Sequence, residues 1–232
     1  MKKLQHKSFA LYFFSFTVLT SLLFYSGCGI AGTIGTPRSH EKKIPAEYNL
    51  AGHRDRKILV LVNQPAWLNA NVNLRFYLTE AINNSLVRNV KIPPGNLVTY
   101  NELSKFRSNQ PNFSLLPPTK VGAALNTNMV LLVMIEDYQL YEIAETGYYK
   151  GSLNVQSILL ETATGKKLWP ESAGSKSVRV GFEVENRGWE FAVKRLATAC
   201  SYCIVRYLYN CPGDKFKIFD DKSDSSWESW KR

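Results

Sequence analysis

This 232-residue sequence has few of the side chains that enzymes most often use for catalysis. It contains three histidines, His6, His40 and His53, and four cysteines. It also has no G-x-x-x-x-G-K-[ST], H-E-x-x-H or G-x-S-x-G motif, which would indicate a phosphate-binding loop, a zinc protease or a serine hydrolase. We therefore predict that the protein is not an enzyme, and we expect no catalytic residues, no metal site and no cofactor.

Dense runs of a single charge are also missing. Lysine and arginine total 29 and aspartate and glutamate 19, which gives a formal net charge of +10. The basic residues are scattered in short groups, such as 42–43 and 166–167, and no group is dense enough to indicate a nucleic-acid-binding stripe. We expect a solvated basic surface and no nucleic-acid partner.

No apolar run is long enough to span a bilayer comfortably. The longest, from Phe9 to Tyr25, has about 17 residues, whereas a transmembrane helix needs about 20. Three lysines precede it, and Ser26 and Gly27 come directly before Cys28. The order basic, apolar, small predicts a secretory signal peptide over residues 1–27. Plain cleavage without lipid and an uncleaved signal anchor remain alternatives.

The cysteine at the cleavage position resembles that of a bacterial lipoprotein signal. This resemblance implies that the mature chain begins at Cys28, with acyl chains that anchor it to a membrane. Gly29 follows, and in enteric lipoproteins a residue other than Asp at this place favours the outer membrane. Glycine, proline and charged residues over 28–45 predict a flexible tether. We expect a cell-envelope protein held at the outer membrane, with its domain in the periplasm.

The hydrophobic pattern of residues 46–212 predicts one α+β domain, in which helices pack on a mixed, mostly antiparallel sheet. Two continuous apolar runs predict buried strands, and alternation over 149–156 predicts a half-buried antiparallel strand. The expected order is β-α-β-α-β-β-β-α. Its elements are a strand at 57–62, a helix at 71–87, a strand at 89–92 or 97–100, a helical stretch of two short helices at 101–106 and 119–125, strands at 129–135, 149–156 and 167–169, and a helix at 188–209. Residues 177–182 are a candidate for an additional edge strand.

Three cysteines, Cys200, Cys203 and Cys211, lie near the end of this domain. The first two form a C-x-x-C motif inside a predicted helix, whereas a thioredoxin-type motif opens a helix. We expect structural, buried thiols, and a disulfide between Cys211 and one of the pair is the alternative.

Aromatic residues supply the candidate partner surface. Tyr138, Tyr141, Tyr148 and Tyr149 surround a predicted hairpin, where they either pack across strands or contact a partner. The polar tail, residues 213–232, carries Trp227 and Trp230 and is expected to be disordered in isolation. Two exposed tryptophans three residues apart are also candidates for docking on a partner or a membrane interface.

Several short phrases together resemble a family of bacterial envelope lipoproteins. They are Ile-Pro-Ala-Glu-Tyr-Asn-Leu at 44–50, the strand 57–62, Gly-Ala-Ala-Leu-Asn-Thr-Asn-Met-Val at 122–130, Tyr-Lys-Gly at 149–151, and 162–169. The group contains the curli-secretion-channel lipoprotein, penicillin-binding-protein activator lipoproteins and the amino-terminal domain of the Tol-Pal translocation protein, and a meningococcal surface lipoprotein family is similar. The resemblance implies proteins that act by binding and assembly, and no catalytic set is carried over.

These observations favour a non-enzymatic, lipid-anchored envelope protein that scaffolds or regulates an outer-membrane or cell-wall assembly. The alternative is a subunit of a secretion or transport apparatus. The expected partners are the membrane, through the lipid at Cys28, and envelope proteins. Association with copies of itself remains open.

Overall fold

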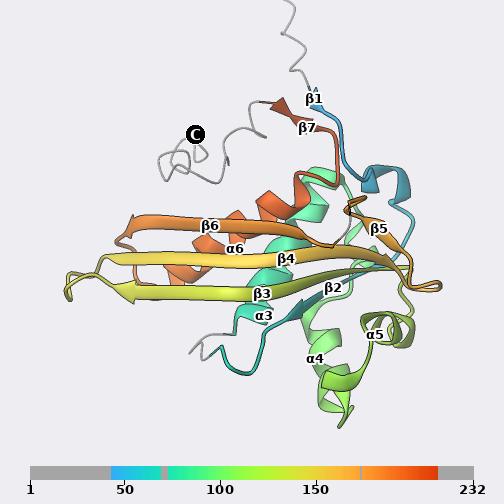
Figure 1. The fold of residues 1–232 in the computed structure, drawn as a ribbon, viewed down its shortest axis with the longest axis horizontal. Helices are drawn as coiled ribbons and strands as arrows, with labels where there is room; N and C mark the ends of the chain where they lie inside the picture. The colour runs from blue at the N-terminus through green and yellow to red at the C-terminus, as the bar shows by residue number, and fades with distance from the viewer. Residues whose placement is uncertain (1–42, 69–72, 173, 214–232) are drawn as a thin grey trace, which may run out of the picture. The chain divides into compact units, whose positions relative to one another are not determined.

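A five-stranded mixed sheet organises the part of the chain that the computed structural model describes, residues 43–68, 73–172 and 174–213 (Figure 1). Strand β2 runs parallel to β3, and β3 pairs antiparallel with β4. Both β5 and β6 pair antiparallel with β4. The predicted α+β class, with a mostly antiparallel sheet, is confirmed. The strands are β2 (Ile58–Asn63), β3 (Met129–Glu142), β4 (Tyr149–Glu161), β5 (Lys167–Trp169) and β6 (Lys176–Glu185).

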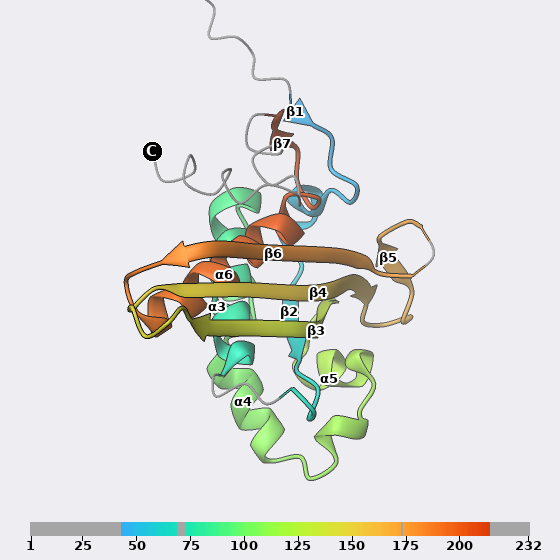
Figure 2. The same ribbon diagram turned by 60° about the vertical axis from the view of Figure 1, so that its left-hand side comes forward.

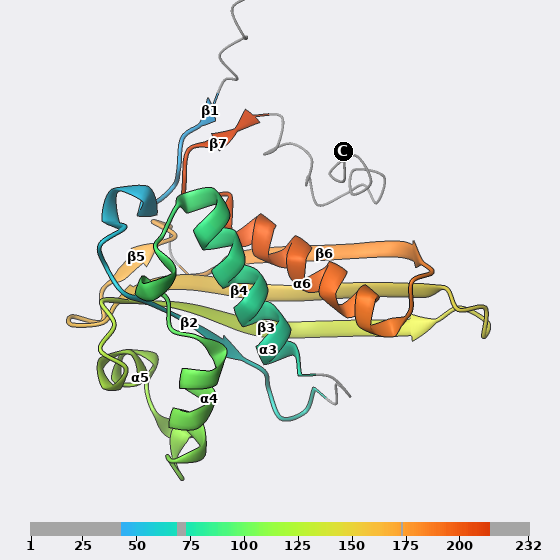
Figure 3. The same cartoon turned by 180° about the vertical axis from the view of Figure 1, so that it is seen from behind.

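Helices α3 (Leu74–Ser85) and α6 (Trp189–Val205) lie side by side across one face of this sheet (Figure 3). The Asn73 side chain caps α3 by accepting a 3.1 Å hydrogen bond from the backbone N–H of Phe76. Alternate strand residues, such as Val60 and Leu131, point into the main core beneath the two helices. The remaining residues of these strands are buried on the opposite face of the sheet. Burial on both faces explains why the strands are continuous apolar runs in the sequence.

A second, smaller core fills the opposite face near β2, under α4 (Tyr100–Ser108) and α5 (Pro118–Ala124) (Figure 2). A capping box begins α4, since Thr99 and Glu102 each bond the other's backbone N–H. Proline at its first position begins α5, where a missing N–H costs nothing. The crossover from β2 to the parallel strand β3 therefore contributes helices to both faces of the sheet.

The predicted second strand, at 89–92 or 97–100, is wrong. Helix α3 continues instead into a π-helical turn, η2 (Leu86–Val90), and a short 3-10 turn, η3 (Pro94–Asn96), follows. Leu97 makes only an isolated parallel bridge to Ile58. Two consecutive prolines, at 93 and 94, lack the N–H groups that a ladder requires, so the segment touches the sheet at one point only.

Other boundaries also differ from the sequence prediction. Strand β3 extends past the predicted end at 135, and it contains a bulge between Ile135 and Asp137. Met134, on the face of the second core, is only partly buried. Lys43–Ile44 forms β1, which pairs with β7 (Cys211–Pro212), so ordered pairing reaches into the segment expected to be a tether. Two further 3-10 turns are η1 (Leu50–His53) and η4 (Phe113–Leu115). In the described ranges, no helix combines the length and apolar character needed to cross a membrane.

Candidate functional site

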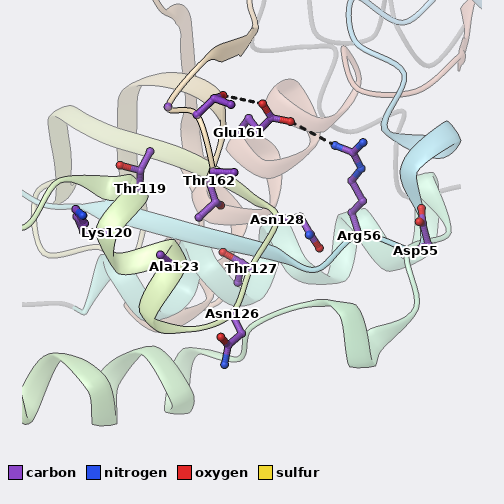
Figure 4. Close-up of a pocket in the computed structure, with 13 residues that line it drawn as sticks. Asp55, Arg56, Thr119, Lys120, Ala123, Asn126, Thr127, Asn128, Glu161 and Thr162 are labelled. Carbon is purple, nitrogen blue, oxygen red and sulfur yellow. Dashed lines mark hydrogen bonds and ion pairs between the residues drawn. The ribbon is translucent and has the colours of Figure 1, made fainter.

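A polar cleft of about 920 Å³ lies where α5 meets the turn after β4 (Figure 4). The segment before β2, the first residues of α5, the loop 126–128 and the turn 161–165 line it. We call it the hairpin cleft. Sequence reasoning did not find it, because its walls come from four segments that only the fold brings together.

Asn128 joins three of those segments. Its Oδ1 accepts a 2.8 Å hydrogen bond from the backbone N–H of Lys57, and its own N–H donates to the Lys57 carbonyl at 2.8 Å. The carbonyl of Asn128 accepts a 2.9 Å bond from the N–H of Thr162. The polar groups of Asn128 at the base of the hairpin cleft are therefore already hydrogen-bonded within the protein, and they stabilise the fold.

The charges of the hairpin cleft are largely engaged with each other. Glu161 lies 3.8 Å from Arg56 and accepts a 2.6 Å hydrogen bond from Thr164 Oγ1 (Figure 4). Lys120 is exposed at the side of α5. Neither histidine nor cysteine is among the residues lining this cleft, and its polar groups are threonine hydroxyls, asparagine amides and charged side chains.

A second cleft, of about 680 Å³, lies on the other side of α5. Its walls are the end of β2 and the loop after it, the last turn of α4, and the segment from Gln110 to the start of α5. Its floor consists of the buried side chains of Leu61, Val121 and Leu132. The volume and the apolar floor are those of a ligand or side-chain pocket.

Two arginines, Arg75 and Arg107, stand in the wall of this second cleft, which we call the arginine groove. Arg75 donates a 3.1 Å hydrogen bond to the carbonyl of Gln64. The Arg107 guanidinium lies 4.7 Å from the ring centre of Phe113. Burial, together with repulsion from Arg75, lowers the pKa of Arg107. Among the described residues, neither arginine forms an ion pair with a carboxylate, and no carboxylate lines the groove.

The β3–β4 hairpin extends beyond the ends of α3 and α6 (Figures 1 and 3). Near its tip, Tyr141, Ile143 and Tyr148 are exposed, with 51%, 37% and 43% of their surface accessible. The turn is held by a 2.7 Å bond from Ile143 N–H to the Tyr148 carbonyl, and Gly147 N–H donates to Glu142 Oε1 at 2.6 Å. The hairpin tip, residues 141–148, therefore presents apolar and aromatic side chains on a hydrogen-bonded frame.

The four tyrosines singled out in the sequence do not form one surface. Tyr138 and Tyr149 are partly buried and pack against the main core, whereas Tyr141 and Tyr148 are exposed. Strand alternation alone places Tyr138 and Tyr141 on opposite faces, and the bulge after Ile135 decides that Tyr138 is the one that faces the main core. Burial raises the pKa of Tyr138, whose hydroxyl has no hydrogen-bond partner within the described part of the chain.

Cys200, Cys203 and Cys211 are buried and none of them is in a disulfide, so the predicted burial is confirmed and the alternative disulfide is not observed. Burial, reinforced by the neighbouring Cys203, raises the pKa of Cys200 well above its usual value. Cys211 donates a 3.3 Å hydrogen bond to the hydroxyl of Tyr209. A raised pKa keeps Cys200 protonated, whereas a nucleophilic or redox-active cysteine requires a thiolate.

Three predicted site residues, Cys28, Trp227 and Trp230, lie outside the described residues. Over 43–68, 73–172 and 174–213, no three histidine, cysteine, aspartate or glutamate side chains gather in a way that would hold a metal ion. Glu136 belongs to the β3 bulge and accepts hydrogen bonds from the side chains of Asn154 and Gln156, so it lies within the part of β3 that extends past residue 135.

No family model matches this chain, and neither does any curated protein. Among solved structures, it is similar to lipoprotein GNA1162 from Neisseria meningitidis, with 18% identity, a TM-score of 0.40, and coverage of 62% of this chain and 94% of that chain. It is also similar to a PelC dodecamer from Paraburkholderia phytofirmans, with 11% identity, a TM-score of 0.41, and coverage of 67% of this chain and 90% of that chain. For the LpoB C-terminal domain from Salmonella enterica, the identity is 20%, the TM-score is 0.33, and the similarity covers 59% of this chain and 84% of that chain. Because these TM-scores are below 0.5, none of these similarities assigns a function to this chain.

Proposed function

We propose that this protein is a non-enzymatic, lipid-anchored component of the bacterial envelope. In this proposal it binds other envelope proteins and scaffolds or regulates an outer-membrane or cell-wall assembly. The leader of residues 1–27 and the cysteine that follows it support export and lipid attachment at Cys28. Acyl chains and the tether would hold the domain at the membrane while leaving its far surfaces free to meet partners.

The single observation that carries the binding role is the hairpin tip. Tyr141, Ile143 and Tyr148 are large side chains that the fold exposes at the end of its longest hairpin. Ala144 and Glu145, in the turn, have φ values of 48° and 55°, a left-handed conformation that costs a non-glycine residue about 1 kcal/mol or more. Rigidly held tyrosines are typical centres of protein–protein interfaces, because they bury a large area with little loss of entropy.

Site-specific photo-cross-linking in cells tests this role. A photoreactive phenylalanine analogue at position 148 of the full-length chain should give discrete cross-linked products. The same analogue at exposed position 120, beside the hairpin cleft, serves as the control. Replacing both Tyr141 and Ile143 by alanine should reduce the products from position 148 at least fivefold. Equal products from both positions, or no loss in the double variant, would contradict a partner surface at the tip.

Lipid attachment is tested separately by metabolic labelling with palmitate. The wild-type chain should incorporate label, and Cys28→Ala should not. The matched control is Cys211→Ala, which removes a buried thiol and should leave labelling unchanged. Label that persists in Cys28→Ala would contradict the proposed anchor.

A further inference from the structure

The arginine groove has no role in the assignment above, yet it has the features of an occupied docking site. Its floor is formed by the apolar side chains of Leu61, Val121 and Leu132. At its margin, Trp67 and Leu115 adjoin lining residues and leave 70% and 79% of their surfaces exposed. Two large exposed apolar side chains beside a cleft with an apolar floor are typical of a binding surface.

The charges of the groove specify what would bind there. Arg75 and Arg107 lie close enough for their repulsion to affect the pKa of Arg107, and no carboxylate lining the groove balances them. A ligand that brings carboxylates would relieve this repulsion, because guanidinium groups form strong, charge-assisted hydrogen bonds with carboxylates. The complementary ligand is therefore acidic and carries large apolar side chains.

The chain itself contains a segment with this composition. Between Phe219 and Trp230 it has four acidic residues and one lysine, a net charge of 1 − 4 = −3, in a protein whose overall formal charge is +10. The same stretch contains three large aromatic residues, Phe219, Trp227 and Trp230. We call residues 219–230 the acidic tail segment.

Length decides which copy supplies this segment. Strand β7, which precedes the tail, lies at the opposite end of the fold from α4 (Figures 1 and 3). From Gly213 to Trp227 an extended chain reaches about 45–50 Å. A domain of this size is about 40 Å across, so a path over its surface to the far end is about 60 Å. The tail is too short to bring its acidic residues around its own domain, and a second copy has no such limit.

We propose that the acidic tail segment of one copy docks in the arginine groove of a second copy. The tail carboxylates pair with Arg75 and Arg107, and its tryptophans cover the apolar floor beside Trp67 and Leu115. Since the tail and the groove are different surfaces, the contact is heterologous, and repeated contacts build a ring or a filament.

Complementation between two variants of the full-length, detergent-solubilised protein tests the proposal. The groove variant carries Arg75→Gln and Arg107→Gln, and the tail variant carries Asp220→Asn, Asp221→Asn, Asp224→Asn and Glu228→Gln. Differently tagged copies of either variant alone should fail to co-purify. A mixture of the two should form a complex, because the tail of the groove variant fits the groove of the tail variant. Equal self-association by all variants, or failure of the mixture, would overturn the proposal.

A binding measurement covers the case in which either variant folds poorly. A fluorescently labelled synthetic peptide of residues 219–230, the acidic tail segment, is titrated into the full-length tail variant. Binding should weaken at least about tenfold when Arg75→Gln and Arg107→Gln are added, and it should weaken with rising salt. Arg179→Gln removes one positive charge from the exposed face of β6, half of what the groove variant removes, and should change binding less than twofold.

Two further binding measurements show whether the groove binds something other than the acidic tail segment. The peptide with its four acidic residues changed to amides should bind at least about tenfold more weakly than the acidic peptide. Equal binding of the two peptides, or no peptide binding at millimolar concentration, would overturn the proposal. So would arginine-dependent binding to phosphatidylglycerol vesicles without peptide binding, because the groove would then be a lipid site.

Discussion

Nε1 of Trp169 donates a 2.8 Å hydrogen bond to Oε2 of Glu47, which lies 122 residues earlier in the chain. Trp169 is fully buried in β5, and Glu47 precedes η1 at the entrance to the domain. The second oxygen of Glu47 accepts a 2.6 Å bond from Lys176, at the start of β6. One carboxylate thus attaches the beginning of the domain to both strands at the far edge of the sheet.

The first prediction follows from this contact. Glu47→Ala should lower the free energy of unfolding by about 1–3 kcal/mol, because the buried indole N–H of Trp169 then has no acceptor. Glu47→Gln keeps an acceptor oxygen and should cost less than half as much. Denaturant unfolding, followed by tryptophan fluorescence, measures both changes. Equal costs for the two variants would show that the charge matters more than the indole bond.

The second prediction concerns the contact between α5 and β3. A Cβ at Gly122 would lie 2.6 Å from Cγ2 of Val130, so Gly122→Ala should destabilise the domain by about 1–3 kcal/mol. Gly52→Ala is the matched control, because no atom lies within 4 Å of the added Cβ. Combining Gly122→Ala with Val130→Ala should cost less than the sum of the single changes, since the two side chains compete for one space. An additive result would place the strain elsewhere.

The third prediction counts reactive thiols. Native protein should react with a thiol reagent at none of Cys200, Cys203 and Cys211, because all three are buried and the raised pKa of Cys200 disfavours its thiolate. After denaturation the purified full-length protein should expose three thiols and not four if Cys28 is acylated as proposed. Rapid reaction in the native state would contradict a structural role for the helical pair.

The fourth prediction is a loss of stability in alkali. Burial raises the pKa values of Tyr138, Tyr202 and Tyr209 above the usual 10.0. The unfolded chain loses these protons above about pH 10 while the folded chain keeps them, so stability is full below pH 10 and falls as pH rises. The slope should be up to about 1.4 kcal/mol per pH unit for each tyrosine.

Tyr138→Phe separates one of these three contributions from the others. Above pH 10, the variant should lose unfolding free energy more slowly with rising pH, by an amount that corresponds to about one titrating proton. It should not destabilise the protein at pH 7, because the lost hydroxyl has no partner among the described residues. Denaturant unfolding at pH 7, 9 and 11 supplies the comparison. An unchanged slope in the variant would show that Tyr138 ionises normally in the folded state.

The sequence by itself determined the features that depend on local pattern. Continuous apolar runs identified β2 and the first half of β3 as central strands, because only strands covered on both faces need apolar residues at every position. Helical periodicity identified α3 and α6. The same signal placed Cys200 and Cys203 on the buried side of a helix, which made a redox site implausible. Apolar residues on both sides of Pro93 and Pro94 indicated a strand, but local pattern did not show that Val90, Ile92 and Leu97 are buried from turns that pack against the core.

Only the tertiary structure decided which side chains meet and which face they occupy. The bulge after Ile135 sends Tyr138 to the core and leaves Tyr141 exposed, and a strict alternation rule cannot anticipate an inserted residue. Arg75 and Arg107 come from helices on opposite faces of the sheet, and no spacing in the sequence relates them. Periodicity reports how each segment is buried, whereas a groove is made by the way separate segments pack, so its charges become visible only when the chain is folded.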